Sequence, residues 1–402
     1  MSHGIRRYIW SGSSFVIALL IACTERVPTA TYRLEPPEAS AKPERVDVAQ
    51  GQRIFRFDRF GNEKFWTDTL RMHEVIQSIV TPRVALSVGL KVDAAALPPG
   101  TLETANLDDT QTTLALIALD AVIGLKGDVV TEPNGRLRLE NVGITCALCH
   151  SAVDNSSGIQ GIGNRLDGWP AVDLQVGPII ALSPALNPLQ RAAYALWPAG
   201  TYDARFNQDG ISDPTRIPPA YGLAEVPCET YTCEGPVSYW NAYVAVTQMH
   251  ARGSFSDPRL GINIVNSPDM VTKKLPALRA YQFSLQKPAP EPGSFDPVRA
   301  ELGRQVFNGD GTCARCHVGS TLTDAPVLHL AAETDMDEGY ALRGTTGKYR
   351  TTPLRGLARH APYFHDGSAA TLEAVVDHYI GALGLTLSPT QKGNLVEYLK
   401  SL

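Results

Sequence analysis

Stretches with a regular hydrophobic pattern alternate along this chain with stretches that have none. Apolar side chains at helical spacing predict helices over residues 109–126 and 238–250, at the start of 297–317, and over 389–402. A strand is predicted where Asn134 and Gly135 mark a turn and Leu137 and Leu139 then alternate with charged residues. The pattern therefore predicts a mainly α fold.

Segments without helical periodicity divide the chain. Gly, Pro and Asn are dense over residues 154–220, which predicts extensive loops, and residues 287–293 (KPAPEPG) are typical of a linker. We therefore expect four parts in the 402 residues. They are a leader over 1–22, a flexible tether over 23–45, a scaffold with a first domain over 46–290, and a second domain over 291–402.

The N-terminus has the features of an export signal. Arg6 and Arg7 precede an apolar run over residues 15–22, which is too short to span a bilayer as a helix. The run ends in Leu-Ile-Ala-Cys, which resembles a bacterial lipobox with Cys23 as the acylated residue. This resemblance predicts a lipid anchor at Cys23 on the periplasmic side of the outer membrane. The alternative is an ordinary signal peptide and a soluble periplasmic protein.

Two pentapeptides carry most of the chemical information, residues 146–150 (CALCH) and 313–317 (CARCH). Each is Cys-x-x-Cys-His, the attachment signal of a c-type haem, in which two sulfurs bind the haem vinyl groups and the following imidazole binds the iron. The expected thioether cysteines are Cys146, Cys149, Cys313 and Cys316, and the expected proximal iron ligands are His150 and His317. A zinc knuckle or a redox dithiol, the alternatives, do not require a histidine directly after the second cysteine.

This interpretation accounts for all seven cysteines of the chain. Cys23 would be acylated and four cysteines would bind haem, which leaves Cys228 and Cys233. Export to an oxidising compartment predicts a disulfide between these two, and a pair of free thiols is the alternative.

The charge balance is mildly acidic, with 41 acidic and 36 basic side chains. An acidic surface argues against nucleic acid as a partner, because nucleic acids bind through basic side chains. It suits docking of a basic electron-transfer protein or small cytochrome, although a solvated acidic face is the commoner reason for such a balance.

Residues 351–379 (TTPLRGLARHAPYFHDGSAATLEAVVDHY) closely resemble the C-terminal haem domain of the bacterial dihaem cytochrome c peroxidases. The same superfamily holds the dihaem enzyme that matures the quinone cofactor of methylamine dehydrogenase and, more distantly, the rubber oxygenases. The resemblance is specific over residues 297–402 and weaker over 140–190. It implies two cytochrome c-like haem domains with extensive loops, and electron transfer between two covalently bound haems.

In this family the residue that ends the helix after the His-Asp-Gly turn is the distal ligand of the second haem. Peroxidases have Met there and the quinone-maturing enzyme has Tyr, and the matching residue here is Tyr379. A tyrosinate is a hard anionic donor that stabilises ferric iron. His378 is the nearest alternative ligand, although one helical step turns it about 100° away. The further alternatives are His365, His360 and Met336.

Three more residues match family positions. By resemblance Arg355 and His365 would contact the haem propionates, a place where the fork of an arginine satisfies carboxylates. Trp169 matches a tryptophan between the haems and would relay electrons. The alternatives are surface charges for Arg355 and His365 and a packing role for Trp169.

The chain departs from the peroxidases beside the first haem. Peroxidases carry a catalytic Glu seven residues after a Gly-Pro-Ile turn, and counting from Gly177 the matching residue is Pro184. No carboxylate lies between Asp173 and Asp203, whereas peroxide cleavage needs a base that moves a proton. The first haem therefore has an apolar open side or is closed by a protein ligand. The candidate ligands are His250, Met249 and Met270.

Residues 207–213 (NQDGISD) place oxygen donors at Asn207, Asp209 and Asp213 around a glycine, which resembles half of a calcium loop. Related peroxidases hold calcium between the haems, and an Asx-rich turn is the alternative. Together these features predict a dihaem c-type cytochrome that acts on peroxide or dioxygen, with no catalytic residue assigned. The alternatives are a non-enzymatic electron carrier and an oxygenase of an apolar substrate.

Overall fold

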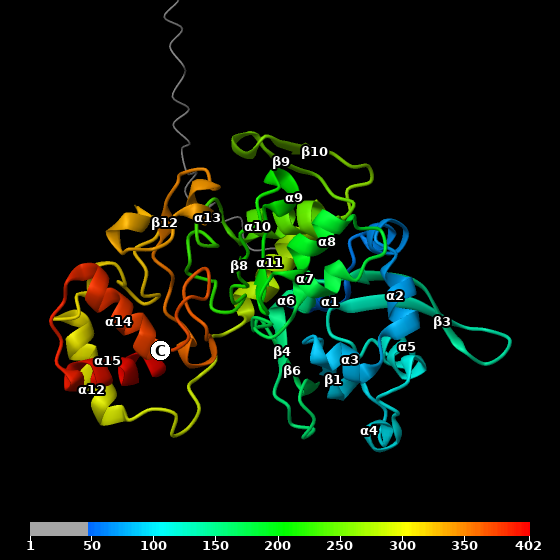
Figure 1. Cartoon of the computed structure of the whole chain (residues 1–402), viewed down its shortest axis with the longest axis horizontal. Coiled ribbons are helices and arrows are strands. Elements are labelled where there is room, and N and C mark those ends of the chain that lie inside the picture. The colour runs from blue at the N-terminus through cyan, green and yellow to red at the C-terminus, as the bar shows by residue number, and fades with distance from the viewer. Residues whose placement is uncertain (1–46) are drawn as a thin grey trace, which may run out of the picture. The chain divides into compact units, whose positions relative to one another are not determined.

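Helices dominate the part of the chain that the computed structural model describes, residues 47–402 (Figure 1). The helices are α1 Val48–Phe57, α2 Met72–Ile79, α3 Pro82–Ser87, α4 Thr101–Thr104, α5 Thr110–Ala118, α6 Ala147–His150, α7 Val176–Ala181, α8 Pro188–Ala195, α9 Phe206–Asp209, α10 Val237–Tyr243, α11 Leu275–Ser284, α12 Pro297–Asn308, α13 Gly339–Leu342, α14 Leu372–Leu383 and α15 Pro389–Lys400. The predicted leader, the anchor residue Cys23 and the tether lie outside the described residues.

The strands are short and pair only in twos within the described residues. They are β1 Val92–Asp93, β2 Leu125–Thr131, β3 Leu137–Ile144, β4 Ser151–Val153, β5 Ile162–Gly163, β6 Arg165–Asp167, β7 Thr201–Tyr202, β8 Thr215–Arg216, β9 Phe255–Asp257, β10 Ile262–Ile264, β11 Leu328–His329 and β12 Tyr349–Arg350. The mainly α prediction is therefore confirmed, whereas the division into two haem domains stays a prediction. The predicted linker falls between α11 and α12, in a segment without helix or strand.

The structure contains the helices and the strand predicted from the sequence, but one of the predicted helices is shorter than expected. The helices near residues 238, 297 and 389 are present as α10, α12 and α15, and the predicted turn and strand are present before and within β3. The helix over 109–126 is right only as far as residue 118. Asp120 and Gly124 adopt φ angles of 55° and 83°, which a right-handed helix excludes, and the chain then enters β2.

Close helix packing organises the two ends of the described chain. Gly51 of α1 faces the backbone of Ala277 in α11, and Gly303 of α12 faces the backbone of Asn394 in α15, so closely that a Cβ has no room. The α12–α15 pair and α14 enclose a core around Phe307. This core also holds Cys313, so the second haem motif is positioned by the C-terminal helices.

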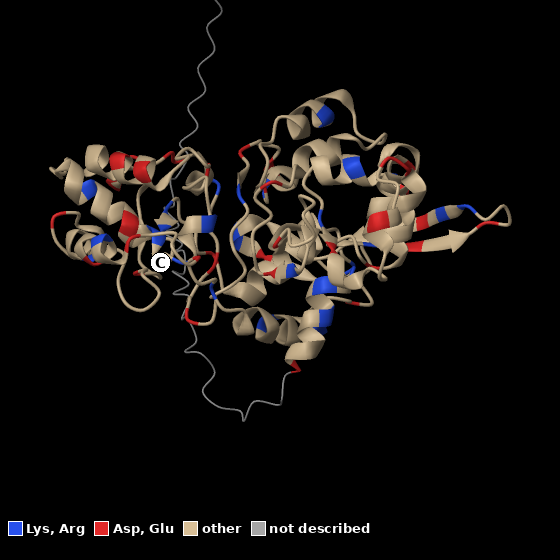
Figure 2. Cartoon of the chain, turned by 90° about the horizontal axis from the view of Figure 1, so that it is seen from below, with Lys and Arg blue, Asp and Glu red and all other residues tan. Residues whose placement is uncertain are grey.

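The described surface carries charges of both signs. Figure 2 shows basic and acidic residues interspersed along the helices and loops. Cys228 and Cys233 form the predicted disulfide. Within residues 47–402, no helix is both long and apolar enough to cross a membrane.

Candidate haem sites

The first Cys-x-x-Cys-His motif forms α6, and a hydrogen bond orients its histidine. His150 Nδ1 lies 3.1 Å from the backbone carbonyl oxygen of Pro218. A carbonyl oxygen only accepts, so Nδ1 carries the proton and Nε2 keeps its lone pair. Burial lowers the pKa of His150 to about 4, so the imidazole is neutral at pH 7. His150 Nε2 is therefore available to an iron.

The second motif repeats this arrangement in a different local structure. Its cysteines lie in a 3-10 turn after α12, and His317 Nδ1 lies 2.9 Å from the carbonyl oxygen of Leu322. Burial lowers the pKa of His317 as well. Two histidines far apart in the chain thus have the same tautomer, with the proton on Nδ1. In metal-ligating histidines a backbone carbonyl often fixes the tautomer and the ring orientation in this way.

The motif cysteines lie in environments that disfavour a thiolate. Burial raises the pKa of Cys146 and of Cys149 to about 12 and that of Cys313 to about 11, and it also raises the pKa of Cys316. Redox dithiols depend on a lowered pKa, and zinc takes the thiolate form. Thioether formation removes the titrating proton altogether. The environment therefore argues against a redox dithiol. It does not bear on the zinc alternative, because a bound zinc ion would itself lower the pKa of its cysteine ligands.

Buried polar atoms without partners show where haem carboxylates fit. Among the described residues, Arg350 Nε, Arg355 Nε and His360 Nε2 are buried and have no hydrogen-bond partner. Burial, and after it the charges of Arg355 and Arg216, lower the pKa of His360 to about 4, so these basic groups lie near one another. The flanking Leu354 packs with Cys313 in one core. Propionates would satisfy donors of this kind beside the second motif.

An unpaired donor also lies near the first motif. Trp240 Nε1 is buried and has no hydrogen-bond partner among the described residues. Trp240 belongs to the core against which Cys146 packs. The residues around both motifs therefore fit a haem.

Tyr379 on α14 lies beside the cysteines of the second motif. Its pKa is raised to about 12, first by burial and then by the neighbouring sulfurs of Cys313 and Cys316. The alternative ligand, His378, directs Nε2 to the backbone carbonyl oxygen of Thr334 at 2.8 Å, and a nitrogen that donates this bond has no lone pair for iron. The geometry favours Tyr379 over this nitrogen of His378, and the ligand assignment stays a prediction.

Replacing Tyr379 by Phe is expected to leave the second haem without its distal ligand, because a phenyl ring has no donor atom. The ferric low-spin signal of that haem should give way to a high-spin signal, and its reduction potential should rise, because an anionic donor is lost. Electron paramagnetic resonance and spectroelectrochemical titration measure the two effects.

Two variants serve as controls for this prediction. Tyr363→Phe removes a tyrosine of the same core whose hydroxyl donates to Leu357, and it should leave both signals unchanged. His378→Phe should also leave them unchanged. A spectrum altered by His378→Phe and not by Tyr379→Phe would make His378 the ligand.

The two predicted propionate contacts have different surroundings. Arg355 is buried, and its Nη1 donates to the carbonyl oxygen of Gly222 at 2.6 Å, which leaves Nε for a carboxylate. His365 Nε2 instead lies 3.1 Å from Tyr349 Oη, and the two rings are 4.8 Å apart. Arg355 thus offers a free donor, whereas His365 is engaged by Tyr349. Both propionate roles stay predictions.

Trp169 contacts segments that belong to each motif's surroundings. The preceding residue, Gly168, donates its N–H to the carbonyl oxygen of His150 at 2.8 Å. The Arg359 guanidinium, from the segment after Arg355, lies 4.9 Å from the centre of the Trp169 ring. The buried Tyr221 ring packs edge-on to it at 6.3 Å. This position suits a relay between two haems, and the role stays a prediction.

Residues 174–202, which include α7, contain no carboxylate. Gly177 packs against Trp197 and the backbone of Tyr194, with no room for a Cβ. Pro184 follows α7, as the sequence states, and the next carboxylate, Asp203, is bound by Arg343 at 2.9 Å. Residues 174–202 therefore offer no other carboxylate that could replace the glutamate that peroxidases have where this chain has Pro184.

The candidate ligands for that open side are dispersed. His250 stacks on the Phe65 ring with centroids 3.6 Å apart. Met249 is buried in a core with Trp240, whereas Met270 is partly exposed beside Gly61. None of these placements makes one of the three the evident ligand, so an open side remains the simpler prediction.

Two of the three predicted calcium residues, Asp209 and Asp213, lie beside the guanidinium of Arg343. Arg343 donates to Asp209 at 2.8 Å and lies 3.9 Å from a carboxylate oxygen of Asp213. The Asn207 amide donates to the carbonyl oxygen of Thr247 at 2.7 Å. A cation here would compete with the charge of Arg343. Calcium stays a prediction, and Arg343 already supplies the positive charge of this cluster.

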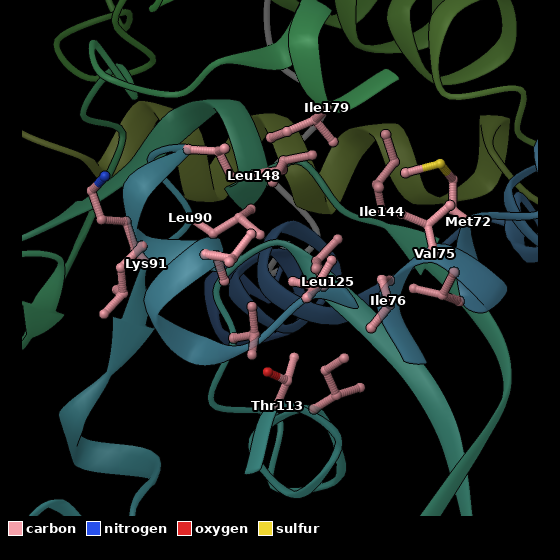
Figure 3. Close-up of a pocket in the computed structure, with 18 of the residues that line it drawn as sticks. Met72, Val75, Ile76, Leu90, Lys91, Thr113, Leu125, Ile144, Leu148 and Ile179 are labelled. Carbon is pink, nitrogen blue, oxygen red and sulfur yellow. The ribbon is translucent and has the colours of Figure 1, made fainter. Parts of the chain in front are cut away.

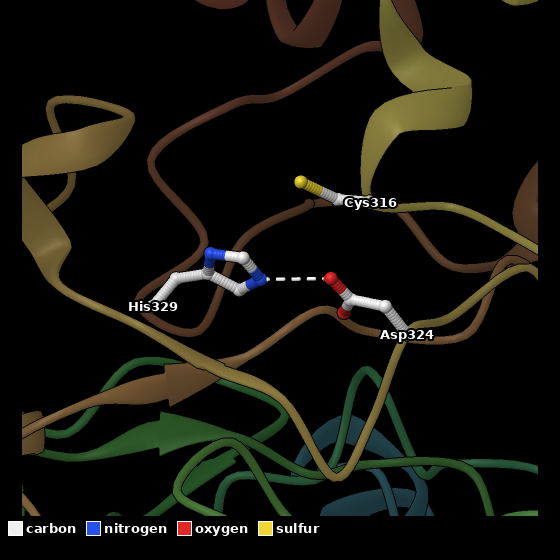
Figure 4. A group of neighbouring side chains, drawn as sticks. All are labelled: Cys316, Asp324 and His329. Carbon is white, nitrogen blue, oxygen red and sulfur yellow. Dashed lines mark hydrogen bonds and ion pairs between the residues drawn. The ribbon is translucent and has the colours of Figure 1, made fainter.

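Cys316 has two potential metal ligands nearby, Asp324 and His329 (Figure 4). His329 Nε2 lies 2.9 Å from Asp324, and its Nδ1 lies 3.0 Å from Glu333. Burial alone would lower the pKa of His329, but the hydrogen bonds to Glu333 and Asp324 outweigh burial and raise it. An imidazole held by carboxylates at both nitrogens is an ion-pair partner, so ion pairing accounts for the contacts of His329 in this group.

Several site residues have no signal in the sequence. Arg343, Arg350 and Arg216 are isolated arginines, and their roles come from contacts between distant segments. The Tyr202 hydroxyl donates to Gln248 at 2.9 Å, and Cys149 is one of the groups near this tyrosine. No spacing rule predicts such a pair.

Parts of the chain are similar to known proteins. No protein-family model matches the chain. It is 38% identical over 87 residues to methylamine utilization protein MauG of Methylorubrum extorquens, covering 20% of this chain and 25% of that one. It is 28% identical over 151 residues to cytochrome-c peroxidase IdrP2 of Denitromonas iodatirespirans, covering 27% and 41%. The chain thus spans less than half the length of these curated relatives.

A further match is cytochrome-c peroxidase IdrP1 of the same organism, 26% identical over 130 residues, covering 24% of this chain and 35% of that one. These matches support the resemblance to the dihaem cytochrome c peroxidase-like superfamily. The relatives' names agree with the predicted family resemblance and imply c-type haem as the cofactor.

Two solved structures are partly similar. A hydrazine synthase of Kuenenia stuttgartiensis has a TM-score of 0.34 and 18% identity, covering 47% of this chain and 73% of that one. A MauG-like protein associated with microbial copper homeostasis has a TM-score of 0.35 and 19% identity, covering 48% and 74%. Such TM-scores support no detailed structural comparison.

Proposed function

We propose that the chain is a lipid-anchored dihaem cytochrome c, facing the periplasm, that carries out redox chemistry on peroxide or dioxygen. One haem would be held by Cys146, Cys149 and His150 (haem 1), and the other by Cys313, Cys316 and His317 (haem 2). When bound, the haems supply electron transfer and activation of the oxidant. The electron donor is an electron-transfer protein, such as a small cytochrome.

The observation that carries this proposal is the position of Trp169. Its neighbour Gly168 is hydrogen-bonded to His150, and its ring lies under Arg359 of the C-terminal haem segment. A single aromatic side chain therefore contacts structure attached to each site. If the two haem sites worked independently, this contact would have no role in electron transfer. If electrons pass between the two haems, Trp169 lies where it could relay them.

The residues divide the work between the sites. His150 and His317 are oriented by backbone carbonyls, so each is prepared to bind iron. Tyr379 suits haem 2 to a role in storing oxidising equivalents, because an anionic donor stabilises oxidised iron. Haem 1, with no acid from residues 174–202 on its open side, is the place where an oxidant would enter.

Two alternatives remain, each with its own observation. Pro184 in place of the peroxidase acid favours a non-enzymatic electron carrier with two six-coordinate haems. An apolar cavity whose wall includes Leu148 favours an oxygenase of an apolar substrate. The first alternative predicts haems that ignore peroxide, and the second predicts stable dioxygen binding at haem 1.

Electron paramagnetic resonance of the fully oxidised protein, with and without peroxide, tests the proposal. We expect one high-spin and one low-spin ferric signal, with the high-spin signal lost when peroxide is added. Two low-spin signals indifferent to peroxide would overturn the enzymatic proposal and favour the electron carrier. Fewer than two covalent haems per chain would overturn the dihaem assignment.

A further inference from the structure

An apolar cavity of about 90 Å³ lies in the core of the N-terminal part (Figure 3). Helices α2, α3, α5 and α7 and strands β2 and β3 form its wall. Almost every lining residue is aliphatic, and Met72, Val75, Ile76 and Ile179 are examples. The cavity is therefore enclosed by hydrocarbon contributed by several elements.

The polar residues of the wall do not make the cavity polar. Lys91 directs Nζ away from the other labelled side chains in Figure 3, to Asp173 and the carbonyl oxygen of Gly89, both at 2.7 Å. Thr113 is buried and its Oγ1 has no hydrogen-bond partner among the described residues. A bound water needs two to four polar partners. This cavity does not offer them, so it excludes water and admits apolar molecules.

The wall of the cavity includes two exposed residues and one residue of the first haem motif. Two of its lining residues are exposed, Val84 of α3 at 39% and Leu182 at the end of α7 at 43%. Leu148, which lies between the two cysteines of the motif, also lines the cavity. Cys149 packs against the same core cluster as the cavity wall. A molecule in the cavity is thus adjacent to the helix that attaches haem 1.

We propose that this cavity is a binding site for dioxygen that serves haem 1. This inference rests on the proposed function and selects between its two oxidants. Dioxygen is small and apolar, so it gains from leaving water for a hydrocarbon cavity. Hydrogen peroxide would lose the hydrogen bonds of two hydroxyl groups there and find no partners, which is costly. The cavity therefore discriminates in favour of dioxygen.

Xenon is the probe for the site itself, because dry apolar cavities of this kind bind it and no haem chemistry is needed. We expect xenon in this cavity when crystals of the oxidised haem protein are pressurised with the gas. Val75→Phe should fill the cavity from α2 and abolish the xenon site. Ile79→Phe is the matched control, because Ile79 lies on the same helix and is 54% exposed.

The rate of dioxygen association with the reduced protein, measured by flash photolysis, tests the role. Val75→Phe should slow it several-fold, and Ile79→Phe should leave it unchanged. Val84→Trp, at a lining residue that is 39% exposed, should slow it as well without crowding the core, which guards against a misfolded Val75→Phe. The rate with peroxide should be unchanged in all three variants.

The outcomes separate the two proposals. A native protein without xenon in the cavity would overturn the site. Loss of xenon in Val75→Phe without slower dioxygen association would overturn the role in dioxygen supply. Xenon in the cavity of a protein whose reduced haems do not bind dioxygen would overturn the assignment of dioxygen as oxidant and leave an apolar ligand site.

Discussion

Replacing Cys146 and Cys149 together by serine is expected to leave one covalent haem per chain instead of two. A serine hydroxyl does not replace the sulfur that forms each thioether bond, and both sulfurs of this motif are removed. The second motif should keep its haem, because Cys313 packs in a separate core with Phe307. Haem absorbance in alkaline pyridine, divided by protein concentration, and the mass of the intact chain measure the number.

The disulfide provides a control for this experiment. Serine at Cys228 and Cys233 changes two buried or half-buried cysteines outside the motifs, so it should keep two haems per chain. Serine at Cys313 and Cys316 should leave only haem 1. Two covalent haems in the Cys146/Cys149 variant would mean that this motif does not attach haem.

Local patterns gave the most reliable part of the sequence interpretation. The helices that begin at Pro297 and Pro389 start where an N-cap side chain, of Asp296 and of Ser388, accepts from the backbone. Such signals lie within a few residues of what they determine. The helix predicted over 109–126 was too long. Its apolar spacing continues beyond residue 118, but the backbone conformations of Asp120 and Gly124 form a turn there.

The candidate sites could be predicted only where spacing encodes them. The five-residue haem motif states which atoms bind haem, and Tyr379 follows from its resemblance to a known pattern. The carbonyl partners of His150 and His317 and the position of Arg359 over Trp169 depend on how distant segments pack. No property of Arg359 in the sequence distinguishes it from other arginines of the chain.

Arg343 is the clearest case of a role set by tertiary structure. Its side chain is 7% exposed and binds Asp203, whose side chain is fully buried, at 2.9 Å. The two residues are 140 positions apart. It also donates to Asp209 at 2.8 Å and to the carbonyl oxygen of Ile211 at 2.9 Å. One guanidinium thus joins the segment after β7 to the C-terminal region.

Arg343→Met is expected to lower the free energy of unfolding by about 3–5 kcal/mol, because it leaves a buried carboxylate without its cation. The value should lie toward the lower end, since Asp203 still accepts backbone N–H groups of Arg205, Phe206 and Asp213. Urea unfolding of the haem protein, followed by circular dichroism, measures the difference.

A surface arginine gives the matched control for this substitution. Arg304→Met breaks an ion pair with Glu301 in which the two side chains are 50% and 55% exposed, so it should leave stability almost unchanged. Arg343→Lys keeps the positive charge but loses the planar guanidinium that binds a carboxylate through two N–H groups. Its effect on stability should lie between those of Arg343→Met and Arg304→Met. Equal effects of Arg343→Met and Arg304→Met would mean that the buried cluster does not stabilise the fold.

The difference in the free energy of unfolding between the native protein and Arg343→Met should become smaller at acidic pH. Burial alone would raise the pKa of Asp209, but the hydrogen bond from Arg343 outweighs it and holds the pKa below its usual range. A carboxyl with a lowered folded-state pKa stabilises the native protein above its unfolded pKa, near 3.9, and loses that contribution as the pH falls through the lowered value. The variant lacks this contribution. Unfolding measured at pH 7 and again below about pH 4 should therefore bring the two proteins closer together, and a deficit that stays constant would assign the effect to lost packing rather than to charge.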